Sequence, residues 1–408
     1  MNQQRRSKSG FVLIVVLVVV MVLALSAYTF SLLMITEHHA TRLMGRQIQS
    51  RYLVESGVDF SRMFLVGDAA TIQEMGGIWD NSMFQNQPVS VNPLNPAEIG
   101  RFSVITSSLD VDGNPGGFRF GLTDESTKLN LNTLVHADNW VPGGGRQLLM
   151  ALPLMTEPIA DCIMDWLDAD DLPRDFGVEA SYYSSQSPPY APKNGPMDSL
   201  EELLLVRGVT PQLLFGMDHN HNGILDLDEQ YTSDVGAYDP EMQLGWANYL
   251  TLYSKENNLN PAGLQRIYIN SDDLDQLYDD LRSEFNDEWS NFIIAYRQNG
   301  AYEGDPEEDG LEEAGPRTYV DIDTSERASH TFSQVLDLID ARTTANGVNE
   351  DGDSIPLLLE SPINSFNMGQ VMTILMANLT TVDGDNIPGR INIMQAPRRI
   401  LESIPGMT

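Results

Sequence analysis

The chain begins with a long uninterrupted apolar segment. No charged residue occurs between Phe11 and Thr36, and three cations lie within the first ten residues. A bilayer span needs about 20 apolar residues, whereas the apolar part of a secretory signal is typically about 7–15 residues long. No small-x-small cleavage site precedes the first acidic residue, Glu37. The pattern therefore predicts a membrane-spanning helix with a cytoplasmic N-terminus rather than a cleaved signal peptide.

The helical repeat continues beyond the apolar segment. Apolar side chains recur at roughly helical spacing as far as Phe64, and no proline interrupts them. We therefore predict one helix over about 11–66, half in lipid and half outside it. Residues 67–100 read as irregular, because glycine and proline interrupt them.

Two short strand candidates come next. They are RFSVITS at 101–107 and GFRFGLTD at 117–124, and a turn-rich connector with Asp110, Asp112 and Asn114 lies between them. Polar side chains of this kind stabilise turns, which we favour over a metal site at this point. The pattern predicts a hairpin packed on the long helix.

From residue 126 onward the pattern changes to short helices separated by loops. We predict a leader at 1–10, a membrane segment at 11–36 and a helix-and-hairpin unit at 37–125. A first helical subdomain at 126–265 and a second at 266–408 follow. The predicted fold class is therefore α+β, with the helices gathered in the later part of the chain.

The clearest helix of the second subdomain begins near Ser271, which can cap it. Its apolar face runs from Leu274 to Tyr296, and Asn299-Gly300 ends it. We interpret this apolar stripe as a face that packs in the core.

Two segments resemble helix–hairpin–helix units, SLEELLLVRGVTPQLLFG at 199–216 and APRRILESIPGMT at 396–408. Such hairpins can offer backbone N–H groups to phosphates. A membrane-anchored DNA-binding protein of a DNA-uptake system is therefore an alternative function. Acidic residues such as Glu201 and Glu402 flank both hairpins, which favours a structural role.

The chain is strongly acidic. It holds 58 acidic and 24 basic residues, a formal net charge of −34. Such a field repels nucleic-acid backbones and anionic lipid headgroups, and it attracts divalent cations. The single cysteine, Cys162, excludes an internal disulfide and lies in an apolar-periodic stretch that indicates core packing.

The sequence DHNHNGILDLDE at 218–229 has the spacing of a calcium loop. Gly223 stands at the sixth position, where the loop must turn sharply. The predicted ligands at positions 1, 3, 5, 7, 9 and 12 are Asp218, Asn220, Asn222, the carbonyl of Ile224, Asp226 and Glu229. His219 and His221 occupy positions that do not bind the ion, so we do not interpret them as a zinc pair.

A second acidic group follows the stretch around Cys162. On a helix Asp165 and Asp168 share a face, and Asp170 and Glu179 could converge with them through the intervening loop. These four residues are a candidate second calcium site. The competing interpretation is a solvated acidic helix end.

Motifs of common enzymes are absent from the sequence. It contains no H-E-x-x-H, no G-x-S-x-G and no Walker loop. We therefore expect a protein that is not an enzyme and has no small-molecule substrate. An anchored metal-dependent hydrolase that uses Asp165 and Asp168 is a weaker alternative, because neither histidine ligands nor a nucleophile accompany them.

The combination of a cationic leader, an apolar helix and an acidic helical domain resembles the type IV prepilin-like proteins. It is most similar to the general secretion pathway protein K family of type II secretion minor pseudopilins. SGFVLIVVLVVVM resembles the prepilin peptidase site, with Gly10 before the cut and Phe11 after it. RYLVESGVDF, DESTKLNLNT, IADCIMDWLDADDLPRDFGVEASYY and RINIMQAPRRILESIPGMT follow the family pattern in order.

The resemblance implies a pilin-like long helix with a small antiparallel sheet and a large inserted helical domain with SAM-like units. It implies cleavage and methylation by prepilin peptidase, an inner-membrane anchor and a periplasmic body. The partners would be other minor pseudopilins at the tip of the pseudopilus, which exports folded proteins across the outer membrane. Most prepilins carry a glutamate five residues after the cut, whereas this chain has Val15, a feature of the K component.

Two departures from the family pattern stand out. Residues 217–389 form a long insertion that the family does not explain. The family's sheet would continue past Thr408, so we expect either a truncated chain or a sheet completed in another way.

Overall fold

The structure is a computed structural model that describes residues 9–90, 99–109, 115–230, 243–313, 319–348 and 353–404. The chain forms two compact units. The first comprises Met1–Asp124 and Met217–Leu244, and the second comprises Glu125–Gly216 and Gly245–Thr408. The candidate calcium loop thus groups with the N-terminal helix, although the sequence pattern assigns it to the subdomain at 126–265. The boundaries of the five predicted segments otherwise stay a prediction.

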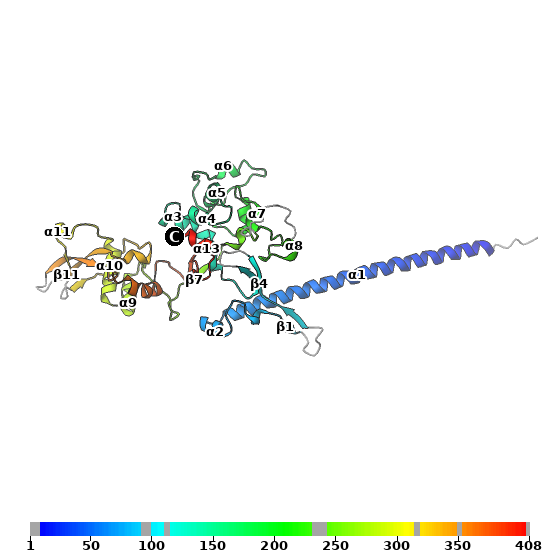
Figure 1. Cartoon of the computed structure of the whole chain (residues 1–408), viewed down its shortest axis with the longest axis horizontal. Helices are drawn as coiled ribbons and strands as arrows, with labels where there is room; N and C mark the ends of the chain where they lie inside the picture. Colours follow the sequence, from blue (N-terminus) through cyan, green and yellow to red (C-terminus); the bar gives the residue numbers. More distant parts are fainter. Residues whose placement is uncertain are drawn as a thin grey trace, which may run out of the picture. The chain divides into compact units, whose positions relative to one another are not determined.

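A single helix dominates the first unit (Figure 1). This helix, α1, spans Ser9–Leu65 over 57 residues, so the predicted continuous helix is confirmed. Its apolar part is long enough to cross a membrane, and none of that part is buried within the structure. At about 1.5 Å per residue only the first half is needed for a bilayer, which leaves the second half to carry the rest of the unit.

The remaining elements of the first unit are short. They are α2 (Ala69–Glu74), η1 (Ser82–Phe84), β1 (Gln87–Ser90), β2 (Ile99–Phe102), β3 (Ile105–Leu109), β4 (Pro115–Phe120) and α8 (Leu227–Gln230). The strands form two antiparallel pairs, β1–β2 and β3–β4. The predicted pairing between the two strand candidates is confirmed as β3–β4.

Two details of the predicted hairpin were wrong. The first candidate, 101–107, is divided between β2 and β3, because Val104 leaves the strand and donates its N–H to the carbonyl of Phe84. The strand β1 and the helix α2 lie within the region that the sequence pattern marks as irregular. Residues Asp110, Asp112 and Asn114 of the connector lie outside the described residues.

Aromatic side chains fasten the first strand pair to α1. Phe84 is fully buried, and its ring centroid lies 4.9 Å from that of Phe64 and 5.8 Å from that of Phe60. Phe60 also contacts Phe102 of β2 at 5.7 Å. A side chain at Gly100 would lie 2.6 Å from Leu53, so glycine lets the strand approach the helix. This cluster fixes the strand pair against the helix.

The second unit contains two hydrophobic cores, which we call the first and second lobes. Buried side chains between Leu129 and Leu252, with Ile400, form the first lobe. Its elements are η3 (Glu125–Thr127), β5 (Leu129–Asn130), η4 (Leu131–Thr133), α3 (Leu134–Trp140), α4 (Gly144–Leu149), α5 (Glu157–Leu167), α6 (Ala180–Tyr183), η5 (Leu200–Leu205), α7 (Pro211–Phe215), η7 (Trp246–Asn248), β6 (Leu250–Thr251) and α13 (Arg398–Ser403).

Buried side chains between Ile269 and Leu379 form the second lobe. Its elements are β8 (Ile267–Tyr268), α9 (Leu274–Glu284), α10 (Asp287–Asn299), α11 (Pro306–Asp309), β9 (Glu312–Glu313), β10 (Tyr319–Asp321), η8 (Val335–Leu338), β11 (Arg342–Val348), β12 (Ser354–Glu360), α12 (Met368–Asn378) and β13 (Leu379–Thr380). A four-stranded sheet of order β10-β11-β12-β9 packs with these helices. The antiparallel pair β7 (Lys255–Asn257) and β14 (Asn386–Pro388) lies outside both cores.

The prediction of one long amphipathic helix in the second lobe is wrong, and so is its predicted cap. The segment forms two helices, α9 and α10, because the side chain of Asn286 accepts the N–H of Trp289 and begins a new helix. Asp273, not Ser271, caps α9 by accepting the N–H of Gln276. The predicted end at Asn299-Gly300 and the packing of the apolar face in a core are confirmed.

The structure describes the first predicted helix–hairpin–helix unit in full and the second in part. In the first, a 3-10 helix (η5) replaces an α-helix, and the turn at Gly208 has a φ of +87° and packs against Ile159. The second begins with α13, and its last residues lie outside the described part of the chain. A SAM-like arrangement therefore stays a prediction.

Truncating the buried phenyl ring in Phe84→Ala should loosen the strand pair from α1. A cavity of this kind typically costs about 3–5 kcal/mol. We expect a lower unfolding midpoint in denaturant for the detergent-solubilised protein, measured by circular dichroism. Phe118→Ala is the matched control, because Phe118 is 55% exposed. Equal midpoints for the two variants would contradict the proposed fastening.

Candidate functional site

The helix α5 places two carboxylates inside the first lobe. Pro158 stands in its first turn, and eight consecutive residues from Ala160 to Leu167 are buried. Asp161 and Asp165 are both fully buried and lie four residues apart, on one face of the helix. Buried charges are costly unless they are paired, so this face requires compensating groups.

Two arginines supply that compensation. Arg146 Nε lies 2.6 Å from Asp161 Oδ1. Arg174 Nη1 lies 2.8 Å from Asp165 Oδ1 and also binds Asp168, while Nη2 lies 3.1 Å from Asp138 Oδ2. One guanidinium thus joins Asp138 of α3 with two carboxylates at the C-terminal end of α5.

Backbone groups of the loop after α5 complete the arrangement. The N–H of Phe176 donates to Asp161 Oδ2 at 3.1 Å, and the N–H of Arg174 donates to Asp165 Oδ2 at 3.2 Å. A side chain at Gly177 would lie 1.7 Å from Asp165 Oδ2, so only glycine fits there. The loop at 168–179 is therefore held against α5.

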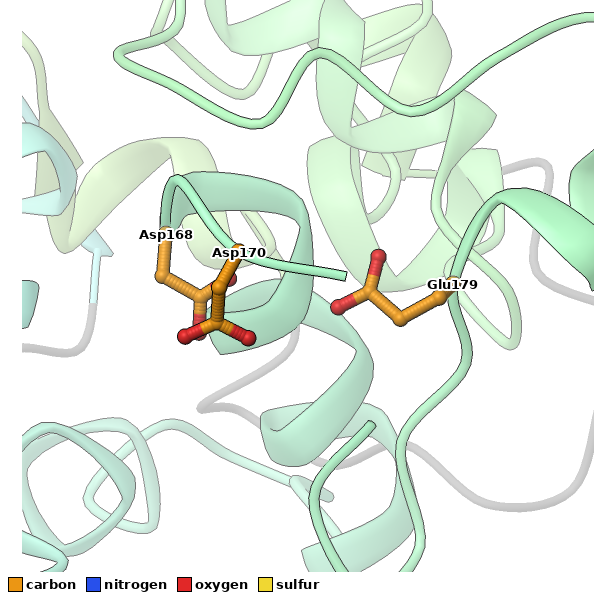
Figure 2. Close-up of side chains that lie close together, drawn as sticks. All are labelled: Asp168, Asp170 and Glu179. Carbon is orange, nitrogen blue, oxygen red and sulfur yellow. The ribbon is translucent and has the colours of Figure 1, made fainter. Parts of the chain in front are cut away.

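This loop brings together three further carboxylates. Ligand oxygens of Asp168, Asp170 and Glu179 all lie within 4.8 Å of one another. Figure 2 shows the carboxylate of Glu179 pointing toward the other two. Glu179 is 4% exposed, and neither of its oxygens has a hydrogen-bond partner. Oδ1 of Asp168 is also buried without one.

The electrostatics of this cluster favour neutralisation. Burial, together with the charges of Asp165 and Asp168, raises the pKa of Glu179 to about 7. Burial also raises the pKa of Asp168, although the bond from Arg174 counteracts the rise. An oxygen-rich group with unpartnered buried atoms has the donor chemistry that hard divalent cations prefer. The residues present therefore fit a calcium ion.

The structure selects three of the four residues predicted for this second site. Asp165 does not join the group, because it accepts both the guanidinium and the backbone N–H of Arg174. The pattern missed Arg174 itself, since it stands alone in a loop and has no periodic relation to the helix. The sequence still held one indication of such an arginine. Asp161 and Asp165 lie on an otherwise apolar helix face, and two buried carboxylates need positively charged partners.

The predicted calcium loop is closed on itself. Asp218 and Glu229, at its two ends, are each 5% exposed. Glu229 Oε1 accepts the N–H of His219 at 2.9 Å, and Oε2 accepts that of Asp226 at 3.0 Å. Asp218 Oδ2 accepts the N–H of Gly223 at 2.7 Å, where φ is +74°. The sixth position thus needs the left-handed backbone that glycine adopts readily.

The side chains between the two ends also point toward one another. The amides of Asn220 and Asn222 both donate to Asp226 Oδ2, at 2.9 Å and 3.0 Å. All the predicted ligands offer oxygen, and the buried Ile224 anchors the loop. The donor set therefore fits calcium, and the binding of an ion stays a prediction.

The cysteine lies in a core as predicted, and the predicted processing residues lie at the start of the long helix, where cleavage stays a prediction. Gly10 and Phe11 stand at the start of α1, and Phe11 is 74% exposed. Cys162 is 1% exposed in the first lobe, and burial raises the pKa of its thiol to about 11. The thiol is therefore a packing group.

Comparisons with known proteins point to one family. Residues 127–217 match the family model of type II secretion system (T2SS), protein K. A putative type II secretion system protein K of Escherichia coli (strain K12) is 38% identical over 58 residues. That match spans 14% of this chain and 18% of the relative. A chain in the crystal structure of the GspK-GspI-GspJ complex from the enterotoxigenic Escherichia coli type 2 secretion system is 19% identical. The match covers 40% of this chain and 56% of that one, with a TM-score of 0.23.

The raised pKa of Glu179 predicts how the metal-free protein responds to pH. Folded protein binds this proton more tightly than the unfolded chain, whose glutamate has a pKa near 4.5. The resulting stabilisation is fully present below about pH 4.5 and is lost as pH rises through about 7. A pKa difference of one unit corresponds to about 1.4 kcal/mol. Protonation of Glu179 at low pH therefore adds on the order of 3 kcal/mol to the free energy of unfolding.

Denaturant unfolding in chelator at several pH values checks this. The wild type should become more stable as the pH falls from about 8 to about 5, and Glu179→Gln should lose most of that dependence. Asp175→Asn, at an exposed position of the same loop, is the control and should behave like the wild type. A pH profile unchanged by Glu179→Gln would refute the assignment.

Proposed function

We propose that this chain, whose residues 127–217 match the type II secretion system protein K family, is a minor pseudopilin at the tip of the pseudopilus. The observation that carries the proposal is α1, whose apolar half is wholly exposed and whose second half packs a small sheet. A helix of this kind can rest in the inner membrane and later pack among the helices of a fibre. The role is structural and not enzymatic, and it supports export of folded proteins.

Position at the tip follows from the start of α1. A helix N-terminus with a free amine is positive, and burying it among apolar neighbours requires an acceptor. A carboxylate at the fifth position after the cut would offer that acceptor to the adjacent subunit. Val15 offers none, so this chain has no acceptor for a subunit added above it. A cap is therefore favoured over a repeating subunit.

The proposed partners are two other minor pseudopilins, named GspI and GspJ in the enterotoxigenic relative. Prepilin peptidase would cut after Gly10. The body of the chain lies in the periplasm, where calcium is available. Nucleic acid is not a proposed partner, because the net charge is −34.

We further propose that calcium binds at two places. Asp168, Asp170 and Glu179 would hold one ion, and the loop from Asp218 to Glu229 would hold the other. A bound divalent cation offsets the mutual repulsion of these carboxylates and ties their segments together. Arg174 binds Asp168 and keeps it in place.

Thermal unfolding in calcium and in chelator tests both sites. Saturating calcium should raise the midpoint by several degrees, since about 100 times the Kd contributes about 2.7 kcal/mol. Glu179→Gln and Glu229→Gln should each remove part of the increase, and the double variant should remove all of it. Asp175→Asn and Asp228→Asn, both at exposed positions, are the matched controls. An identical midpoint in calcium and chelator would exclude the calcium proposal.

Purification of the tagged chain from native membranes in mild detergent tests the pseudopilin role. We expect two other minor pseudopilins to co-purify and the N-terminus to be Phe11, as read by mass spectrometry. A single-span membrane protein with the same tag is the control. Recovery of no pseudopilin, together with an uncut N-terminus, would defeat the proposal.

A further inference from the structure

The second lobe carries a long stretch without charge. Between residues 267 and 379 there are 24 acidic and five basic residues, a net charge of −19. Residues 361–382 contain no charged side chain at all, although 20% of the chain is charged. The stretch includes a turn at 361–367 and the helix α12. An uncharged segment in so acidic a lobe calls for a reason beyond solubility.

The turn presents one aromatic side chain to solvent. Phe366 is 100% exposed, more than any other large apolar residue described. Its N–H donates to Asn364 Oδ1 at 3.0 Å, and the amide of Asn367 donates to the carbonyl of Pro362 at 2.9 Å. The neighbouring Ser365 binds Asp340 through its N–H and its hydroxyl group. The phenyl ring therefore projects from a turn with a dense network of hydrogen bonds.

The outer face of α12 continues this surface. Leu375 is fully buried and fixes the inner face of the helix. Gln370, Thr373 and Ile374 of the same helix face solvent, and Ile374 is 53% exposed. Exposed helix faces in soluble proteins normally carry charged residues, and this one has none.

We propose that Phe366 and the outer face of α12 form a docking surface for a protein partner that has an apolar pocket bordered by lysine or arginine. A rigid aromatic side chain is the usual anchor of a protein interface, because its ordering costs little entropy on binding. The basic border is the chemistry that complements the net charge of −19 of the lobe that carries the anchor, in which Asp340 binds the residue next to it. A second copy of this lobe carries the same charge and would be repelled, as would an anionic membrane.

This surface is independent of the pseudopilin role proposed above. It lies in the insertion, outside residues 127–217 that match the family. Loss of the surface should therefore leave processing at Gly10 and recovery of the other pseudopilins unchanged.

Site-specific photo-crosslinking identifies the occupant. A benzophenone amino acid replaces Phe366 in the full chain within native cells, and the same group at Tyr319, 69% exposed in the same lobe, is the control. We expect one discrete protein adduct from position 366 and none from 319. The absence of a discrete adduct, a crosslinked second copy or a lipid adduct would each overturn the proposal.

The adduct is then identified, purified and titrated against the full chain. Phe366→Ser should weaken binding by about 10–100-fold, as for an aromatic anchor, whereas Tyr319→Ser should stay within about twofold. Ile374→Ser should weaken it by several-fold. Binding should weaken further when salt rises from about 50 to about 500 mM, because the rim is charged. Affinity that is insensitive to Phe366→Ser, or that does not fall with salt, would refute the proposed chemistry.

Discussion

A chain with 58 acidic residues that forms a core must neutralise the carboxylates that it buries. In this protein that requirement organises the first lobe. Asp161 and Asp165 occupy the buried face of α5, and they attract Arg146, Arg174 and the N–H groups of the following loop. Because removing any of these partners would leave an uncompensated charge in the core, these contacts hold the loop against α5. The same loop carries Asp170 and Glu179, so the geometry of the candidate calcium site depends on the arginine pairs beside it.

The buried carboxylates divide into three groups by the way they are satisfied. Asp165 is bound by an arginine, and Glu229 accepts backbone N–H groups. Glu179 has neither, although it is buried as deeply as Glu229. The first two kinds of carboxylate explain how the segments hold together without a metal. The third is the strongest physical reason to propose a cation, since hydrogen bonds do not compensate its burial.

Features that depend on spacing along the chain could be predicted from the sequence. The helix α1 follows from an unbroken apolar period, and the closed turn at 218–229 follows from the spacing of its oxygen-bearing side chains and from Gly223. Features that depend on distant partners could not be predicted in this way. Arg174 gains its role only when three carboxylates converge on it, and the break before α10 depends on a local cap at Asn286 that overrides a continuous apolar stripe. The pattern grouped Asp165 with Asp168, Asp170 and Glu179, whereas in the structure Asp165 is bound by Arg174. A cation at the remaining three carboxylates stays a prediction.

Charge also explains why an apolar docking surface is compatible with a soluble insertion. Apolar patches promote association between copies of a protein, and a strong net charge of one sign opposes it. With a net charge of −19, the second lobe can expose Phe366 and Ile374 and still repel other copies of itself. A partner with a basic border meets attraction where a second copy meets repulsion. The acidic residues of the second lobe therefore contribute selectivity, and the uncharged stretch contributes the contact area.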